Sequence, residues 1–285
     1  MLTRLVLFVY ALTTILSTAH AQTPDSTSPD SMPLSAETVM SRMFDTRQVE
    51  DEIAVLEFVI TKPNGEEQRV TYTMLWKNNH GKNGFDQKVI FVTDFPPSRK
   101  GVAYMGFLRQ AGSNANDEEW IYLPELAMVR RIAHRGRDQS DDDEFGLSIL
   151  KREHLDPRPP ELDDHRLLES ESVGETAHYK VESRVKTTGN QTMPFDTYHT
   201  WVDATSFRPA RVQFFLGGNT KPELDMTIEW TQVNNQWVWK RVSAVAPDSG
   251  AKTVMNISKI KVNSGLKDTV FSKRSLSRGI DRYIR

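Results

Sequence analysis

The chain has 285 residues, no cysteine, and 36 basic against 38 acidic residues, which gives a formal net charge of −2 at pH 7. A chain of this length can bury one sizeable hydrophobic core, and without disulfides its stability must come from that core. The balanced charge gives no reason to expect nucleic acid as a partner and no general attraction to anionic membranes.

The first residues have the pattern of a secretory signal peptide. A short basic head, Met1–Arg4, precedes an almost wholly apolar stretch, Leu5–Leu16, and Ala19-His20-Ala21 has the small-residue pattern of a signal-peptidase site. The sequence therefore predicts a signal peptide over residues 1–21, cleaved after Ala21, and export to the periplasm. The apolar stretch is too short for an ordinary membrane span, so no transmembrane segment is expected in the mature chain.

The mature chain begins with a polar segment and continues as one domain. Residues 22–33 are rich in Ser, Pro, Thr and Asp, which is typical of a disordered tether. Residues 34–285 are expected to form a single domain that opens with a helix from Ser35, its N-cap, to about Val49. The apolar face of this helix carries Val39, Met40, Met43 and Phe44.

Beyond the helix, apolar residues recur with period two, which indicates strands. Residues 54–60 and 70–76 alternate in this way on either side of the hairpin signal Pro63-Asn64-Gly65. Further alternating runs lie within residues 89–91, 102–108, 120–123, 179–181, 198–202, 212–216, 224–230, 237–245 and 253–262. Ten or eleven strands joined mostly by short turns predict a mainly β fold, built as one large antiparallel sheet or open barrel.

Two regions depart from the strand pattern. Residues 138–175 contain the acidic run Asp141–Glu144, a short apolar patch and the proline-rich Asp156–Pro160, and we expect a long excursion with one or two helical turns. This segment could cover the sheet as a lid, or it could be a surface insertion without such a role, and the sequence leaves both interpretations open. Residues 268–285 are expected to form a short terminal helix and a basic tail.

Catalytic and metal-binding motifs are not recognisable. The acidic run lies near His134 and His154, but its spacing fits neither a calcium loop nor a zinc motif, and a solvated loop is the better interpretation. Gly217-Gly218 is expected to be a turn rather than a phosphate loop. A catalytic triad assembled from residues distant in sequence stays open, and no cofactor or metal is expected.

Large apolar side chains on the predicted strands are the stronger signal. On a curved sheet such side chains can surround a hollow that they do not fill, and methionines adapt to varied apolar ligands. An ordinary filled core is the alternative. Arg130 and Arg131 are adjacent in a strand and face opposite ways, so at most one of them can meet a polar ligand head. The candidate ligand-binding residues are Trp76, Phe91, Tyr104, Met105, Phe107, Trp120, Tyr122, Arg130, Arg131, Phe214 and Trp230.

The chain resembles the LolA-like outer-membrane lipoprotein-sorting proteins over most of its length after the tether. The resemblance rests on Arg99-Lys-Gly101, on Asp117-Glu-Glu-Trp-Ile-Tyr-Leu-Pro124, on Val129-Arg-Arg-Ile132, and near the end on Phe271-Ser272 with Leu276. One segment departs from the family, since residues 141–148 read DDDEFGLS where members usually have a Gly-Ser-Asp-Phe loop. This departure concerns the lid and therefore the ligand class.

The resemblance implies an unclosed β-barrel with helices as a lid over its open side. It also implies a periplasmic carrier that holds a lipid, a lipoprotein acyl chain or another amphiphile and moves it towards the outer membrane. Relatives of this branch accompany inner-membrane exporters of the resistance-nodulation-division type, which makes such an exporter the expected partner. The alternatives are a non-enzymatic adaptor subunit of an envelope transport complex and, as the weakest, an envelope lipid hydrolase.

Overall fold

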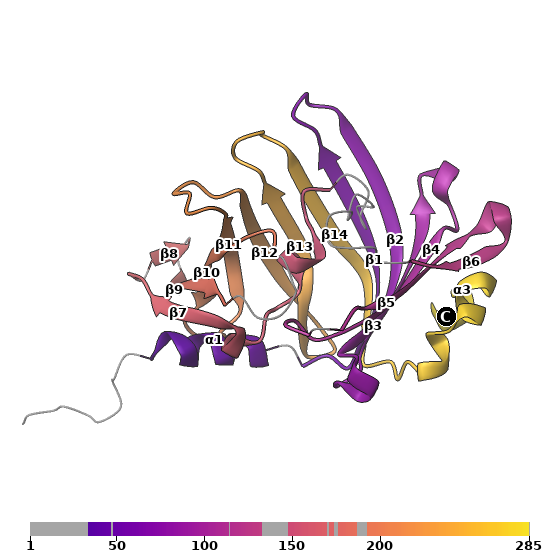
Figure 1. The fold of residues 1–285 in the computed structure, drawn as a ribbon, viewed down its shortest axis with the longest axis horizontal. Coiled ribbons are helices and arrows are strands. Elements are labelled where there is room, and N and C mark those ends of the chain that lie inside the picture. The colour runs from indigo at the N-terminus through magenta and orange to yellow at the C-terminus, as the bar shows by residue number, and fades with distance from the viewer. Residues whose placement is uncertain are drawn as a thin grey trace, which may run out of the picture. The chain divides into compact units, whose positions relative to one another are not determined.

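Fourteen antiparallel strands in one curved sheet form the framework of the protein (Figure 1). The computed structural model describes residues 34–46, 48–113, 115–132, 148–169, 171–173, 176–186 and 193–284. The predicted signal peptide, the predicted tether and the acidic run of residues 141–144 lie outside the described residues.

The two halves of the chain form the two halves of the sheet. The first half supplies β1 (Asp51–Thr61), β2 (Glu67–Asn78), β3 (Gln87–Phe95), β4 (Ala103–Leu108), β5 (Glu118–Leu123) and β6 (Met128–Arg131). The second half supplies β7 (Asp163–Leu167), β8 (Glu171–Val173), β9 (Thr176–Val185), β10 (Thr197–Asp203), β11 (Pro209–Phe215), β12 (Leu224–Val233), β13 (Gln236–Val245) and β14 (Lys252–Val262).

The order of the strands leaves the sheet open. It runs β6-β5-β4-β3-β2-β1-β14-β13-β12-β11-β10-β9-β7, with β8 paired to β9, and the pairing of β1 with β14 joins the two halves. Strands β6 and β7 end the described sheet on its two sides and do not pair with each other. The predicted fold class, a mainly β protein with an unclosed antiparallel sheet, is confirmed.

The predicted number of strands was too low because three strands carry almost no periodic signal. Strands β6, β7 and β8 have four, five and three residues. The sequence of β7, Asp-Asp-His-Arg-Leu, contains one apolar residue and cannot show alternation. These strands are held by pairing to longer neighbours rather than by their own pattern. Strands β7 and β8 lie in the region that was expected to be an excursion, and β6 lies just before it.

Short helices cover both faces of the sheet. Helix α1 (Ala36–Asp45) starts at the predicted N-cap, where the Ser35 hydroxyl accepts a hydrogen bond from the backbone N–H of Thr38. Its apolar face packs on one side of the sheet, which we call the inner face, near β7 and β9.

The C-terminal helices α3 (Lys273–Arg278) and α4 (Asp281–Ile284) lie with the apolar cluster of the other side, the outer face, where α3 meets β4, β5 and β6. The remaining helical segments are α2 (Arg152–Leu155), η1 (Lys82–Gly84), η2 (Pro97–Arg99), η3 (Pro124–Leu126), η4 (Pro160–Leu162) and η5 (Asp268–Val270). In the described part of the chain, none of the helices has the length and apolarity to cross a membrane.

A buried carboxylate holds the chain where it leaves β14 for the C-terminal helices. Asp51, 3% exposed, accepts hydrogen bonds from the backbone N–H groups of Ser264, Gly265 and Leu266 and from the Ser264 hydroxyl, at 2.6–3.0 Å. Burial disfavours the charge of this carboxylate, but the hydrogen bonds outweigh burial and hold the pKa of Asp51 below its usual value. The charged form of Asp51 therefore stabilises the covering of the outer face.

Replacing Asp51 with alanine should lower the free energy of unfolding by about 2–3 kcal/mol at pH 7, because four donors lose a charged acceptor. The difference from wild type should shrink as the pH falls through the lowered pKa of Asp51, since a protonated carboxyl accepts these bonds poorly. Urea unfolding at several pH values measures both effects. The matched control is Asp248→Ala at an exposed ion pair, expected within about 0.5 kcal/mol of wild type.

Candidate functional site

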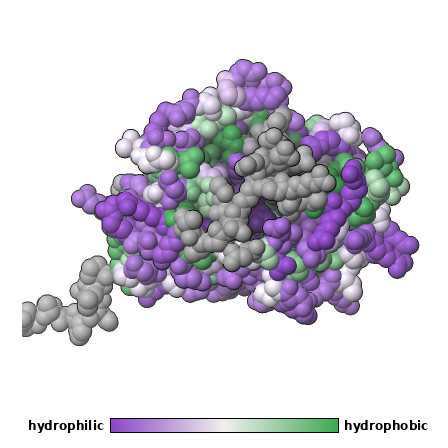
Figure 2. Space-filling view, in the orientation of Figure 1, coloured by the Kyte–Doolittle hydropathy of each residue, from purple (hydrophilic) through white to green (hydrophobic). Residues whose placement is uncertain are grey.

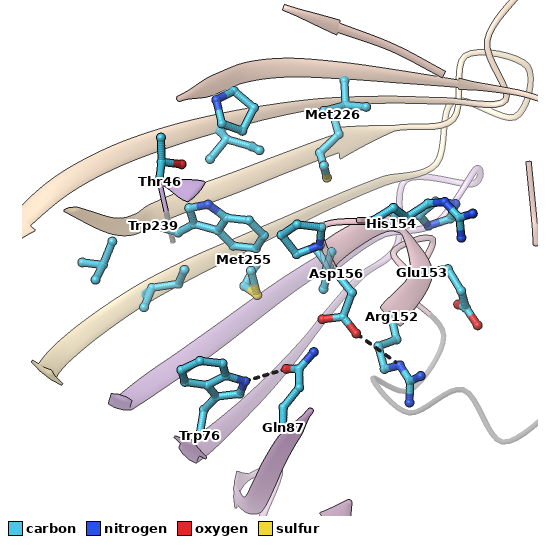
Figure 3. A pocket seen from close by; sticks show the side chains of 18 of the residues that line it. Thr46, Trp76, Gln87, Arg152, Glu153, His154, Asp156, Met226, Trp239 and Met255 are labelled. Atoms are coloured by element: carbon cyan, nitrogen blue, oxygen red, sulfur yellow. Dashed lines mark hydrogen bonds and ion pairs between the residues drawn. The ribbon is translucent and has the colours of Figure 1, made fainter. Parts of the chain in front are cut away.

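A cavity of about 260 Å³ lies on the inner face of the sheet. Its walls come from strands of both halves of the sheet, from the end of α1, and from the segment that contains α2 (Figure 3). Most of the wall is aromatic or aliphatic. The aromatic residues that line it are Phe44, Trp76, Phe91, Phe195, Tyr198, Phe214, Trp230, Trp237 and Trp239.

Two of the four indole rings that line the cavity, those of Trp76 and Trp230, present apolar surface to it because their N–H groups are used elsewhere. Trp76 Nε1 donates to Gln87 Oε1 at 2.6 Å, and Trp230 Nε1 donates to the backbone oxygen of Pro209 at 2.8 Å. The Trp230 ring also meets Trp239 edge to face, with ring centroids 6.2 Å apart. A ligand beside these residues would therefore meet ring faces and edges rather than free donors.

One wall of the cavity is a segment that crosses the inner face, residues 148–162, which we call the strap. In Figure 1 it is the pink-red chain in front of the sheet, between the grey trace and β7. At its start the Ser148 hydroxyl lies 3.2 Å from the Thr253 hydroxyl of β14, and Leu150 is fully buried in the inner core. The strap then places Arg152, His154 and Arg158 along the cavity.

Ion pairs attach the strap on both sides of the cavity. Arg152 Nη1 contacts Asp117 Oδ2, just before β5, at 2.6 Å. Arg158, 7% exposed at its side chain, donates from Nε and Nη2 to Asp163 in β7 at 2.9–3.1 Å. The Tyr198 hydroxyl donates to the same carboxylate at 2.6 Å, and burial together with the charge of Asp163 raises the pKa of Tyr198 far above its usual value. Tyr198 therefore stays a donor, and the Asp163 charge is paired and hydrogen-bonded.

His154 is oriented by the helix to which it belongs. Its Nδ1 accepts the backbone N–H of Lys151, the N-cap residue of α2, at 3.0 Å. Its ring lies against two phenylalanines, with centroids 5.7 Å from Phe195 and 4.7 Å from Phe214. Burial, and to a lesser degree the charge of Lys151, lowers the pKa of His154 from 6.5 to about 4, so the imidazole is neutral at neutral pH.

Four of the predicted ligand-binding residues line the cavity: Trp76, Phe91, Phe214 and Trp230. Tyr104 is on the same face, since it pairs with Phe91, but it lies outside the lining. The Tyr104 hydroxyl donates to the Glu119 carboxylate instead. Each of the four lining residues stands on a different strand, so the cavity exists only once β2, β3, β11 and β12 are assembled.

The structure places Met105, Phe107, Trp120 and Tyr122 on the outer face, which differs from the expectation that they line the same hollow as Trp76. The register decides the point. Trp76 pairs with Val89, whereas Trp120 pairs with Met105, which pairs with Ile90, which pairs with Leu75. Outer-face residues of β4 and β5 pack under the C-terminal helices, with Leu276 of α3 in the same cluster. Both faces of these strands are apolar, so alternation alone does not reveal which one faces the cavity.

Trp120 is therefore a structural residue of the outer face. Phe107 meets it edge to face at 5.1 Å, and the Lys273 ammonium of α3 lies 5.7 Å from its ring centroid. Its Nε1 is buried without a hydrogen-bond partner among the described residues, and we have no physical account of that unpaired donor.

Arg130 and Arg131 lie on the edge strand β6, and neither lines the cavity. They face opposite ways, as predicted, because Arg130 pairs with Ile121 and Arg131 with Trp120. Both are exposed, and Arg131 lies 3.6 Å from Glu118. Binding of a polar ligand head by Arg130 or Arg131 stays a prediction, and the position of both residues outside the cavity lining does not support it.

The polar part of the site was missed from the sequence. Arg152, His154 and Arg158 lie within the region expected to be an excursion, and His154 was considered only beside the acidic run. Leu150 and the extended Asp156–Pro160 stretch were the available signals that this segment packs on the sheet. Neither signal indicates against which strands it packs, because the partners Asp117 and Asp163 are set by tertiary structure.

Replacing Arg158 with methionine should lower the free energy of unfolding by about 3 kcal/mol or more, because the Asp163 carboxylate stays buried without its cation. Urea unfolding at pH 7 measures this. Arg166→Met, which removes a largely exposed partner of Glu182, is the matched control and should cost less than about 1 kcal/mol. Equal losses in the two variants would show that the strap ion pair is solvated.

Acidification should destabilise the protein through His154. Because its pKa is lower in the folded chain than in the unfolded chain, its contribution is neutral above about pH 6.5 and becomes unfavourable as the pH falls towards 4. The loss should approach about 3 kcal/mol near pH 4. The measurement is the pH dependence of unfolding in wild type and in His154→Phe, and the prediction fails if the two curves are parallel.

One family model matches more than half of the chain. A family model described as "Uncharacterized protein" matches residues 85–278. The sequence has no match among curated proteins.

Solved structures share the fold at low sequence identity. A DUF1329 family protein from Desulfovibrio piger superimposes with a TM-score of 0.72 at 20% identity, over 85% of this chain and 97% of that one. A domain from Vibrio parahaemolyticus, named as an outer membrane lipoprotein-sorting protein, gives 0.69 at 20% identity over 85% and 98%. A LolA superfamily protein from Nitrosomonas europaea gives 0.58 at 17% identity over 85% and 99%. The resemblance to LolA-like proteins that the sequence indicated is confirmed.

Proposed function

The chain belongs to the protein family whose model matches residues 85–278 and has a LolA-like fold, and from this premise we propose that it is a periplasmic carrier of an amphiphile. The carrier would hold the apolar part of its cargo in the inner-face cavity and would release it to an acceptor at or towards the outer membrane. The predicted signal peptide supports the location.

The observation that carries the proposal is an aromatic cavity on the inner face in which the indole N–H groups of Trp76 and Trp230 are already paired. Each methylene moved from water into such a site contributes about 0.8 kcal/mol. The volume of about 260 Å³ is just below the usual range of ligand cavities, which is about 300–1,000 Å³. One apolar tail or one small amphiphile fits this volume better than the several chains of a lipoprotein anchor.

The partner in transfer is proposed on the family resemblance alone. An inner-membrane exporter of the resistance-nodulation-division type would supply the cargo, and the carrier would accept it without hydrolysis of its own. Affinity purification of such an exporter from the same cell, with and without the carrier, would test this part of the proposal.

An adaptor role has one feature in its favour. Strand β6 ends the described sheet, and the neighbouring turn exposes Leu126 and Met128, at 62% and 40% exposure. Figure 2 shows hydrophobic surface at this end of the sheet beside hydrophilic residues. Such an edge can pair with a strand of another protein. Copurification of a membrane complex with a lipid-free protein would favour the adaptor over the carrier.

The hydrolase alternative finds little support at the one serine–histidine contact that the described residues contain. His165 Nδ1 lies 2.8 Å from Ser183 Oγ, and His165 Nε2 lies 2.9 Å from the backbone oxygen of Pro160. Ser183 is fully buried beneath the inner core, so a substrate carbonyl could not approach its hydroxyl. This contact stabilises β7 against β9 rather than supplying a nucleophile.

Native mass spectrometry of the mature protein from bacterial periplasm, followed by lipid extraction, should reveal about one bound amphiphile per chain. A lipid-free mass, together with failure of the protein to bind the fluorescent probe N-phenyl-1-naphthylamine or tetradecanoic acid, would contradict the carrier.

Trp76→Ala should weaken binding of N-phenyl-1-naphthylamine by about tenfold or more, because an aromatic wall of the cavity is lost. Trp120→Ala is the matched control on the outer face and should leave the affinity of the folded fraction within about twofold of wild type. Fluorescence titration measures both, with circular dichroism to determine the folded fraction. Equal weakening in the two variants would place the probe outside the inner-face cavity.

A further inference from the structure

We propose that His154 selects the cargo by donating a hydrogen bond from its Nε2–H to an oxygen of the bound amphiphile. The cavity would then prefer a cargo whose apolar tail carries a carbonyl oxygen, as in an ester, amide or carboxyl group, over a plain hydrocarbon. This inference rests on the proposed carrier function and adds a chemical class to its cargo.

The position of the proton on His154 follows from its backbone contact. Lys151 N–H is a permanent donor and points to Nδ1 at 3.0 Å, so Nδ1 must be the acceptor nitrogen. In a neutral imidazole the proton is then on Nε2, which makes that nitrogen a donor. Burial and the nearby Lys151 charge keep the pKa of His154 low, which supports the neutral form.

The ring of His154 is held between two aromatic neighbours beside the cavity. Phe195 stacks on it at an interplanar angle of 28°, and Phe214 lies against it at 55°. His154 lines the cavity, and its Nε2 has no hydrogen-bond partner among the described residues. The Nε2 atom keeps some accessible surface, unlike the fully buried Nε1 of Trp120. A donor fixed in this way needs little reorganisation to bind an acceptor.

Neighbouring donors on the wall already have acceptors within the protein. Trp76 and Trp230 donate to Gln87 and to the Pro209 backbone, and the Tyr198 hydroxyl donates to Asp163. The Arg158 guanidinium makes its two short bonds to the same carboxylate. His154 keeps its Nε2–H for a ligand, because that nitrogen has no hydrogen-bond partner among the described residues.

An unpaired donor in an apolar site discriminates against ligands that cannot accept a hydrogen bond. A hydrocarbon that displaces water from Nε2–H leaves the donor unsatisfied, whereas a carbonyl oxygen restores the bond. Discrimination of this kind amounts to about tenfold or more in affinity.

The test compares methyl tetradecanoate with pentadecane, two uncharged probes of similar length, as competitors of N-phenyl-1-naphthylamine. Wild type should bind the ester about tenfold or more tightly than the alkane. His154→Phe keeps the aromatic contacts but removes the donor, so the preference should fall to within about threefold while alkane binding is kept. His80→Phe, at an exposed histidine that does not line the cavity, should retain the full preference.

Two further measurements cover the case in which His154→Phe does not fold. His154→Gln retains an N–H donor and should keep part of the ester preference. In wild type, the ¹⁵N resonance of His154 Nε2 should shift on addition of methyl tetradecanoate and not on addition of pentadecane.

Each outcome decides one proposal. A preference retained in His154→Phe, or an Nε2 resonance that responds alike to both probes, would overturn the role of His154 and leave the carrier intact. Failure of wild type to bind either probe or N-phenyl-1-naphthylamine would instead overturn the carrier.

Discussion

A single open sheet that is apolar on its inner face, and on the outer face of its first half, is the constraint on which the rest of this structure depends. Fourteen strands lie in one layer, and no second sheet is present in the described residues to cover either face. Apolar surface that stays in water costs free energy, so each face must be covered by other parts of the chain. The C-terminal helices cover the outer face of β4–β6, and α1 with the strap covers the inner face. The two coverings differ in completeness, and the cavity is the part of the inner face that remains unfilled.

Buried charge makes the coverings specific. Asp51 binds the turn that leads to the C-terminal helices, and Asp163 binds Arg158 of the strap together with Tyr198. Such groups contribute little net stability compared with apolar packing, but each tolerates one arrangement of its partners. These buried carboxylates therefore fix the positions of the short helical segments. Hydrophobic contact alone would determine those positions less well.

The polar groups of the cavity wall differ in whether they already have a hydrogen-bond partner within the protein. The Trp76 and Trp230 indoles and the Tyr198 phenol donate within the protein, so these residues offer a ligand mainly apolar area. His154 differs because its Nδ1 accepts the backbone N–H of Lys151 at the start of its own helix. This leaves Nε2–H as one oriented donor beside two aromatic rings. Such a wall suits an amphiphile that has one acceptor near an apolar tail. The LolA-like fold supplies the hollow, and the strap supplies the chemistry within it.

The sequence by itself determined the class of fold, the helix at Ser35 and the long strands, because period-two alternation and an N-cap are local signals. It also identified Trp76, Phe91, Phe214 and Trp230, which line the cavity. Only the tertiary structure decided that Trp120 faces away from Trp76. Alternation shows that successive side chains of a strand point to opposite faces, but it does not show which face encloses the hollow. The strap was likewise decided by tertiary structure. Its Arg152 and Arg158 are positioned by Asp117 and Asp163, whose pairing depends on strands that meet only when the sheet has formed.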